Sequence, residues 1–200
     1  MNFAVLASGN GTNLQAIIKA VKNKQIKATL KVVVSDKPAA FALERARKAG
    51  VPVVEHISPK GYASREEHDK ALVDLLKKEA IDFVVLAGYM RILSPVFILA
   101  YRDRILNVHP ALLPAFKGPQ AIKDALAYGA KVTGVTVHLV DEEVDHGPIV
   151  AQAAVEIQPG DTYDELAERV HAAEHQLYPY AISLMVRGRI KVAGRVVKIG

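Results

Sequence analysis

Two side chains suited to polar catalysis lie two residues apart in the segment Leu106-Asn107-Val108-His109-Pro110. Residues at this spacing on a β-strand project from the same face, and Pro110 favours the end of the strand. An asparagine amide donates hydrogen bonds at any pH, whereas a histidine can be a cationic donor and proton carrier near neutrality. We predict that Asn107 and His109 stabilise an oxyanion; the alternative is a structural histidine at a strand end.

An acidic loop at residues 141–148 supplies a carboxylate for this pair. If the strand before the loop lies beside the strand that carries His109, Asp145 can reach the imidazole and favour its protonated form. The Gly147–Pro148 turn should fix the direction of Asp145. We therefore predict a catalytic group of Asn107, His109 and Asp145, with the other acidic residues of the loop solvated.

No residue of the chain is predicted to act as the nucleophile. The sequence has no cysteine, and no Gly-x-Ser-x-Gly elbow accompanies the histidine and the aspartate. His171 and His175 have i, i+4 spacing, but they do not form the His-Glu-x-x-His zinc motif and are interpreted as a pair on a helix surface. We expect a metal-free reaction whose nucleophile comes from a substrate.

The glycine-rich segment Ser8-Gly9-Asn10-Gly11-Thr12-Asn13 lies between a predicted strand and a predicted helix. Backbone amides at a helix N-terminus can hold a phosphate. The spacing matches neither the dinucleotide fingerprint nor the Walker loop, so a dinucleotide or a nucleoside triphosphate is disfavoured. The alternative is a simple turn capped by Thr12 or Asn13.

These segments require a scaffold in which strands alternate with helices. Predicted strands are Phe3–Ala7, Leu30–Ser35, Val51–Glu55, Phe83–Ala87 and Ile105–His109, and predicted helices are Leu14–Val21, Phe41–Ala49 and Glu66–Glu79. The alternation predicts an α/β fold with a mostly parallel twisted sheet and helices on both faces. Ligands of such sheets bind beyond the carboxyl ends of the strands, where the polar segments fall.

The C-terminal part of the chain follows a different pattern. Strand-like runs at Val135–Val140 and Ile149–Ile157 predict antiparallel pairing. A long helix is expected from Thr162, with Glu165 completing a capping box, and Pro179 should kink or end it. From Gly188 the sequence predicts a small hairpin or an edge extension.

The composition narrows the class of protein. The chain has 200 residues, half of them hydrophobic, with no repeat or linker, so we expect one domain over residues 1–200. The segment Met1–Ala7 lacks the features of a signal peptide and no apolar run reaches bilayer length, so we expect a cytoplasmic location and no membrane partner. The net charge of +5 suits anionic ligands, although the basic C-terminal residues are more simply a solvated tail.

Four segments spread over nearly the whole chain carry a common signature: ASGNGTNLQAI (7–17), LAGYMRIL (86–93), NVHPALLP (107–114) and DHGPI (145–149). In residue identity, order and spacing, these segments closely resemble the phosphoribosylglycinamide formyltransferases, a family of folate-dependent enzymes of purine synthesis. The resemblance implies a Rossmann-like formyltransferase fold. It also implies formyl transfer from 10-formyltetrahydrofolate to the amine of 5-phosphoribosylglycinamide (glycinamide ribonucleotide) in de novo purine (IMP) biosynthesis.

The resemblance also implies roles for individual residues. The ribonucleotide is expected to contact Gly11, Thr12, Asn13 and Glu174. The folate is expected to contact Arg65, Met90, Arg91, Ile92, Leu93, Asn107, Val140, Asp141, Glu142, Glu143 and Val144. Residues 1–100 are then the phosphate-binding half and residues 101–200 the folate and catalytic half. Both partners are small molecules, no nucleic acid is expected, and a homodimer is left open.

The implied mechanism uses the residues predicted above. The substrate amine attacks the formyl carbon, Asn107 and protonated His109 stabilise the oxyanion of a tetrahedral intermediate, and Asp145 keeps His109 charged and helps move protons through water. Two positions depart from the family pattern: Lys117 stands where a proline is common, and His146 where a small residue is common. The second places a titratable group beside the predicted catalytic carboxylate.

Three alternative functions fit parts of the same pattern. A formyltetrahydrofolate hydrolase would use the same groups on water, but that family carries an additional N-terminal regulatory domain, which we do not expect here. A methionyl-tRNA formyltransferase shares the Leu-Leu-Pro signature but typically adds a C-terminal RNA-binding domain, for which the basic tail is too short. A non-catalytic module that binds a nucleotide phosphate would have ligand affinity without deformylation.

Overall fold

Nine strands form one sheet in the computed structural model, which describes residues 1–200, in the order β3-β2-β1-β4-β5-β6-β7-β9-β8. The first five strands run parallel, and β6 pairs antiparallel with β5 and β7. The mostly parallel sheet and its antiparallel C-terminal part are therefore confirmed. The strands are β1 (Asn2–Leu6), β2 (Thr29–Ser35), β3 (Val53–His56), β4 (Phe83–Leu86), β5 (Ile105–His109), β6 (Val132–Leu139), β7 (Ile149–Glu156), β8 (Ile190–Ala193) and β9 (Val196–Ile199).

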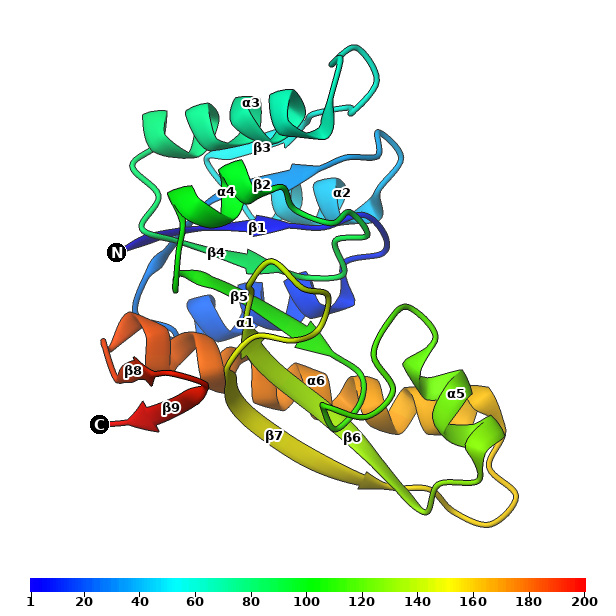
Figure 1. The fold of residues 1–200 in the computed structure, drawn as a ribbon. Helices are drawn as coiled ribbons and strands as arrows, with labels where there is room; N and C mark the ends of the chain where they lie inside the picture. The colour runs from blue at the N-terminus through cyan, green and yellow to red at the C-terminus, as the bar shows by residue number, and fades with distance from the viewer.

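Helices cover both faces of the sheet, as Figure 1 shows. Their bounds are α1 (Thr12–Lys22), α2 (Phe41–Lys48), α3 (Arg65–Lys78), α4 (Pro95–Ala100), α5 (Ala121–Tyr128) and α6 (Tyr163–Val186). A cluster of 16 buried residues joins α3 and α4 to one face, and a cluster of 31 joins α1, α2, α5 and α6 to the other. None of the helices combines the length and the apolar character needed to cross a lipid bilayer.

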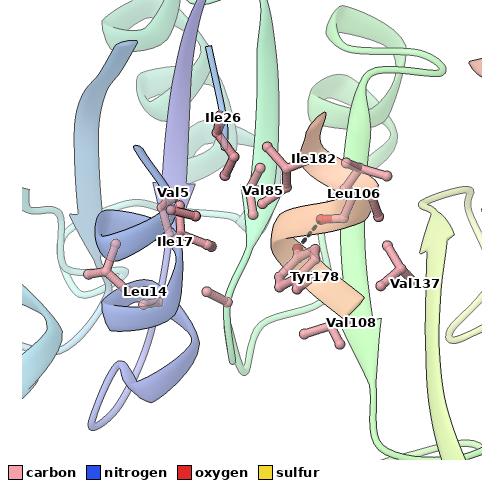
Figure 2. Packing of buried hydrophobic residues seen from close by; sticks show 14 of the residues in the cluster. Val5, Leu14, Ile17, Ile26, Val85, Leu106, Val108, Val137, Tyr178 and Ile182 are labelled. Atoms are coloured by element: carbon pink, nitrogen blue, oxygen red, sulfur yellow. Dashed lines mark hydrogen bonds between the residues drawn. The ribbon is translucent and has the colours of Figure 1, made fainter. Parts of the chain in front are cut away.

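The larger core cluster anchors α1 and α6 to the strands that carry the predicted site. Val5, Val85 and Leu106 of neighbouring strands pack against Ile17 of α1 and Tyr178 of α6 (Figure 2). The buried Tyr178 hydroxyl lies within hydrogen-bonding distance of two main-chain carbonyls, those of Leu86 at 2.8 Å and Leu106 at 2.9 Å. This contact fixes α6 against the ends of β4 and β5.

The predicted elements agree with the structure to within three residues at their ends, with two omissions and one correction. The short helices α4 and α5 were not predicted. Helix α6 does not end at Pro179 but continues to Val186. Residues on both sides of the proline are buried against the sheet, and this packing outweighs the cost of about 3 kcal/mol that an internal proline imposes.

Gly134 allows β6 to approach its neighbours closely. A β-carbon at this position would lie 2.2 Å from the carbonyl oxygen of Ala153 on β7 and 2.7 Å from the Leu112 side chain. Because a backbone atom must move, Gly134→Ala should lower the free energy of unfolding by about 1–3 kcal/mol. Urea denaturation measures the loss, and Gly9→Ala, whose β-carbon meets no atom within 4 Å, is the control. Equal stability of the two variants would contradict the prediction.

Candidate active site

The strand order changes direction between β1 and β4, which is where open α/β sheets form a ligand crevice. Ligands of open α/β sheets bind at this point, beyond the carboxyl ends of the strands. Two hydrogen bonds join the loops that follow the two strands: Ser8 N–H donates to the Gly88 carbonyl at 3.0 Å, and Met90 N–H donates to Ser8 Oγ at 2.9 Å. The glycine-rich loop and the segment 88–93 therefore form one edge of the crevice.

The glycine-rich loop leads directly into α1. The N-cap residue is Gly11, in the left-handed conformation at φ 76°, and no side chain caps the helix. The alternative of a turn capped by Thr12 or Asn13 is therefore wrong. A β-carbon on Gly11 would lie 2.8 Å from Cβ of Ala42, so both the backbone angle and the packing favour glycine. The exposed first turn of α1 suits an anion.

The Asn13 side chain contacts α6 in the C-terminal part of the chain. Its Nδ2 donates to Oε2 of Glu174 on α6 at 3.0 Å, and Oδ1 of Asn13 is buried without a hydrogen-bond partner. Nδ1 of His171 lies 3.0 Å from the same Glu174 oxygen. Two of the four residues predicted to bind the ribonucleotide, Asn13 and Glu174, thus form a polar cluster with His171, which the sequence analysis did not assign to it.

The Glu174 carboxylate raises the pKa of His171, although burial acts in the opposite direction. Glu174→Gln should therefore lower the pKa of His171, as followed by NMR titration of its ring protons. A raised folded-state pKa stabilises the fold fully below the unfolded value of 6.5, and this contribution disappears as the pH rises through the folded value. Glu165→Gln, on the same helix without a His171 contact, is the control; an unchanged His171 pKa in Glu174→Gln would refute the assignment.

The predicted pair on β5 lies beside a third histidine. Strand pairing places Asn107 opposite His138 of β6, and Nδ2 of Asn107 lies 3.2 Å from Nε2 of His138. Nδ1 of the His138 ring lies 2.8 Å from the Leu139 carbonyl oxygen. His138 was missed because its proximity depends on the antiparallel register of β5 and β6, which the sequence does not reveal.

His109 is almost fully buried and both of its ring nitrogens face oxygen atoms. Nε2 lies 2.8 Å from the Phe116 carbonyl oxygen, and Nδ1 lies 3.3 Å from Oδ2 of Asp145. A carbonyl and a carboxylate are both acceptors, so this arrangement suits an imidazolium that donates from both nitrogens. The expected approach of Asp145 to His109 is thereby observed.

The Asp145 carboxylate is held in its charged form. Burial acts to raise its pKa, but the nearby His138 ring, the Gly118 N–H and the charge of His109 outweigh burial and lower the pKa below its usual value. The Gly118 amide donates to Oδ2 at 2.9 Å, and Asp145 itself adopts a left-handed backbone with φ 48°. An ionised carboxylate at this position can stabilise a protonated His109 and accept a proton from water.

Gly147 closes the loop that carries Asp145. A β-carbon on Gly147 would lie 1.9 Å from the Leu139 carbonyl oxygen, so no larger residue fits. The next residue, Pro148, accepts a hydrogen bond from Leu139 N–H at 2.9 Å. The close packing of Gly147 and Pro148 against Leu139 supports the prediction that the Gly–Pro turn fixes the direction of Asp145.

The same loop lines a cavity of about 250 Å³. Four residues assigned to folate contribute to its wall, Val140, Asp141, Glu142 and Glu143, together with Ile98, Arg102, Asp103 and His146, which were not assigned. His146 differs from the expectation: its Nδ1 lies 2.7 Å from Oδ2 of Asp141, and the side chain is not paired with the adjacent Asp145.

Other residues assigned to folate lie in the segment that follows β4 and at the start of α3. Met90 and Ile92 are largely exposed, whereas Leu93 is buried in the smaller core cluster. Nε of Arg91 is buried without a hydrogen-bond partner. Arg65 begins α3 and pairs with Glu66 at 3.6 Å. None of these residues lines the cavity, nor do Asn107 and Val144, and the assignment of all the folate residues stays a prediction.

The structure contains no cluster of three histidine, cysteine or acidic side chains arranged to hold a metal ion. His171 pairs with Glu174, and Nε2 of His175 is buried without a partner. The expectation of a metal-free reaction stays a prediction about the mechanism.

Fold and site together define a class of protein: an α/β enzyme in which the Asn107 amide, the His109 imidazole and the Asp145 carboxylate lie close together near the carboxyl edge of the parallel strands. The formyl transferase family model matches residues 1–182, and the chain belongs to this family. It is 46% identical to phosphoribosylglycinamide formyltransferase of Escherichia coli over 96% of this chain and 90% of that protein.

Two further comparisons extend this result. The chain is 45% identical to the trifunctional purine biosynthetic protein adenosine-3 of Drosophila melanogaster, but it spans only 14% of that much longer protein. The crystal structure of glycinamide ribonucleotide transformylase 1 from Symbiobacterium toebii matches with a TM-score of 0.97 at 47% identity, over 100% of this chain and 93% of that one. The expected Rossmann-like formyltransferase fold is therefore confirmed.

Proposed function

We propose that this chain transfers a formyl group from 10-formyltetrahydrofolate to the amine of 5-phosphoribosylglycinamide, in de novo purine biosynthesis. The relatives from Escherichia coli and Symbiobacterium toebii, a phosphoribosylglycinamide formyltransferase and a glycinamide ribonucleotide transformylase, support this activity at 46% and 47% identity. The proposal assigns phosphate binding mainly to residues 1–100 and folate binding and catalysis mainly to residues 101–200 of one domain. It places the reaction in the cytoplasm, with two small-molecule partners and no nucleic acid.

One observation carries the proposal: a single loop supplies both a wall of the cavity and the carboxylate that contacts His109. Val140 and the acidic residues 141–143 line the cavity, while Asp145 lies 3.3 Å from the His109 ring. A ligand bound in the cavity would therefore lie next to the reactive group. This arrangement suits a donor substrate whose ring system is held by the loop.

The cavity fits one ring system of a folate. Its volume of about 250 Å³ is below the roughly 300–1,000 Å³ of pockets that enclose a whole ligand. Ile98 and Val140 supply apolar surface, and the acidic loop supplies acceptors for the amino and N–H groups of a pterin ring. The bound folate would supply the formyl carbon at the Asn107–His109 edge.

The ribonucleotide fits the opposite side of the crevice. Backbone amides of the uncapped α1 N-terminus suit its phosphate, and the buried Glu174 carboxylate, fixed by Asn13, suits ribose hydroxyls. In the transfer, the substrate nitrogen bonds to the formyl carbon and the bond from that carbon to the folate nitrogen breaks. The proton lost by the amine passes through water to the folate nitrogen, with Asp145 as the relay.

Asn107 and His109 stabilise the negative charge that develops on the formyl oxygen. In the structure their N–H groups face the His138 ring and the Phe116 carbonyl oxygen. The oxyanion therefore competes with neutral acceptors, and its full negative charge favours the exchange. Asp145 keeps the imidazole cationic through this step.

The folate absorbance change, measured with and without glycinamide ribonucleotide, tests this proposal. A change only in the presence of the nucleotide supports the transferase. A change without it identifies a hydrolase, and no change in either mixture, with nucleotide binding retained, identifies a non-catalytic binding module. Either of the last two results overturns the proposal.

A further inference from the structure

The C-terminal hairpin of β8 and β9 lies against the start of β7, where the loop that carries Asp145 ends (Figure 1). Strand β9 pairs with β7 through Val196 and Ile149. This pairing places the hairpin turn, which contains Arg195, beside His146. The hairpin thus adds two strands to the sheet edge and also reaches the loop at residues 141–146.

Arg195 contacts both the side chain and the main chain of His146. Its Nη1 lies 2.8 Å from Nε2 of the imidazole, and its Nη2 donates to the main-chain carbonyl of His146 at 2.5 Å. The same Nη1 also lies 3.4 Å from Nδ1 of the His146 ring. Nδ1 of the ring lies 2.7 Å from Oδ2 of Asp141.

The chain of contacts continues into the loop. Oδ1 of Asp141 accepts a hydrogen bond from the Glu143 N–H at 3.1 Å. Asp141 and Glu143 also line the cavity. Arg195, His146 and Asp141 therefore connect the C-terminal hairpin to the wall of the proposed folate site.

His146 is adjacent to Asp145 in the chain, so its contacts also constrain the Asp145 backbone. His146 lies between Asp145, whose backbone is in the left-handed region at φ 48°, and Gly147, which has no space for a side chain. A non-glycine residue in this region persists only when surrounding contacts hold it. The Arg195 contact to the His146 carbonyl fixes the peptide between His146 and Gly147, one residue after Asp145.

We propose that Arg195 and His146 are positioning residues that hold the loop 141–146, and with it the Asp145 carboxylate, in the geometry required for catalysis. This inference rests on the proposed function, because the loop is assigned both to folate binding and to catalysis. Neither residue touches the reacting atoms. Their effect passes through the shape of the loop and through the direction of Asp145.

Steady-state kinetics of Arg195→Ala test the inference. We expect the KM for formyl folate to rise about 10-fold and kcat to fall several-fold, since small misplacements of catalytic groups can cost up to about 10²-fold in rate. The KM for the ribonucleotide should stay within about twofold, because that site is formed by α1 and α6. Arg195→Lys, which keeps the charge but loses the two-pronged contact, should show a similar defect.

Lys198→Ala is the matched control. Lys198 is an exposed cation of the same hairpin with no hydrogen bond to the loop, so its removal changes the net charge equally. The His146→Ala variant should reproduce the defect of Arg195→Ala, and the double variant should be no worse than either single one. An equal effect of Lys198→Ala, or fully additive effects of the two substitutions, would overturn the positioning role.

Hydrogen exchange provides a readout that does not depend on the activity. Amides of residues 141–147 should exchange faster in Arg195→Ala than in the wild-type chain, whereas those of α1 should not change. If the wild-type chain shows no formyl transfer, the proposed function fails but the exchange experiment still tests the contact. Unchanged exchange in the loop, together with wild-type kinetics, would refute the inference.

Discussion

A His109→Ala variant should transfer formyl groups about 10²–10³ times more slowly than the wild-type chain, because it loses a hydrogen-bond donor to the developing oxyanion. Both ring nitrogens of His109 are engaged, with Phe116 and with Asp145. The substitution leaves these partners without their donor, so we also expect the free energy of unfolding to fall by about 1–3 kcal/mol. This loss is small enough for a domain of ordinary stability to remain folded.

Single-turnover rates at saturating substrates, with circular dichroism as a check of the fold, measure this effect. His56→Ala, at an exposed histidine at the end of β3, controls for the loss of an imidazole elsewhere on the sheet. Wild-type turnover by purified His109→Ala would refute the assignment of His109 to the catalytic group. A low rate caused by unfolding would be visible in the spectrum.

An Asp145→Asn variant should lose about 10²–10⁴-fold in kcat, the range expected when a proton-transfer group is removed. The asparagine has the size of the aspartate, so the Gly118 N–H can keep an oxygen acceptor where the carboxylate lay at 2.9 Å. The negative charge is lost, however, and with it the group that favours a protonated His109. Single-turnover kinetics should show a slow chemical step with little change in ribonucleotide affinity.

The pH dependence of stability separates this variant further from the wild type. Asp145 has a lowered pKa in the folded chain, despite its burial, because His138, Gly118 and His109 surround it. A lowered folded-state pKa stabilises the protein above the unfolded value of 3.8, and this contribution is lost as the pH falls through the folded-state value. Urea unfolding from pH 3 to pH 7 should therefore show a steeper acid loss in the wild type than in Asp145→Asn. Parallel curves would contradict the charged state of Asp145.

Local signals in the sequence were sufficient for most of the scaffold. Alternating β-branched runs and amphipathic segments predicted the parallel strands and α1 to α3, because burial on both faces of a sheet imposes such a pattern. The helices α4 and α5 were missed; the six residues of α4 are too few to show clear periodicity. The length of α6 was decided by packing: the burial of residues around Pro179 exceeds the local preference of proline to end a helix.

The residues proposed for the catalytic group could be selected from the sequence. Asn107 and His109, two residues apart on one strand, and Asp145 beside a Gly–Pro turn could be selected from residue types and spacing alone. Tertiary structure decided what surrounds them. His138 meets Asn107 through the β5–β6 register, Phe116 meets His109 through a loop, and His146 turns toward Asp141 and Arg195.

The physical reason for this division is the range of the interactions. Residue type and local spacing reveal the donors, acceptors and charges on one element and the face on which they lie. Which atoms compete for the His109 nitrogens, and what lowers the pKa of Asp145, depends on contacts between segments 7 to 36 residues apart. Strand register and loop closure set those contacts, and both follow from burying the two faces of the sheet at once.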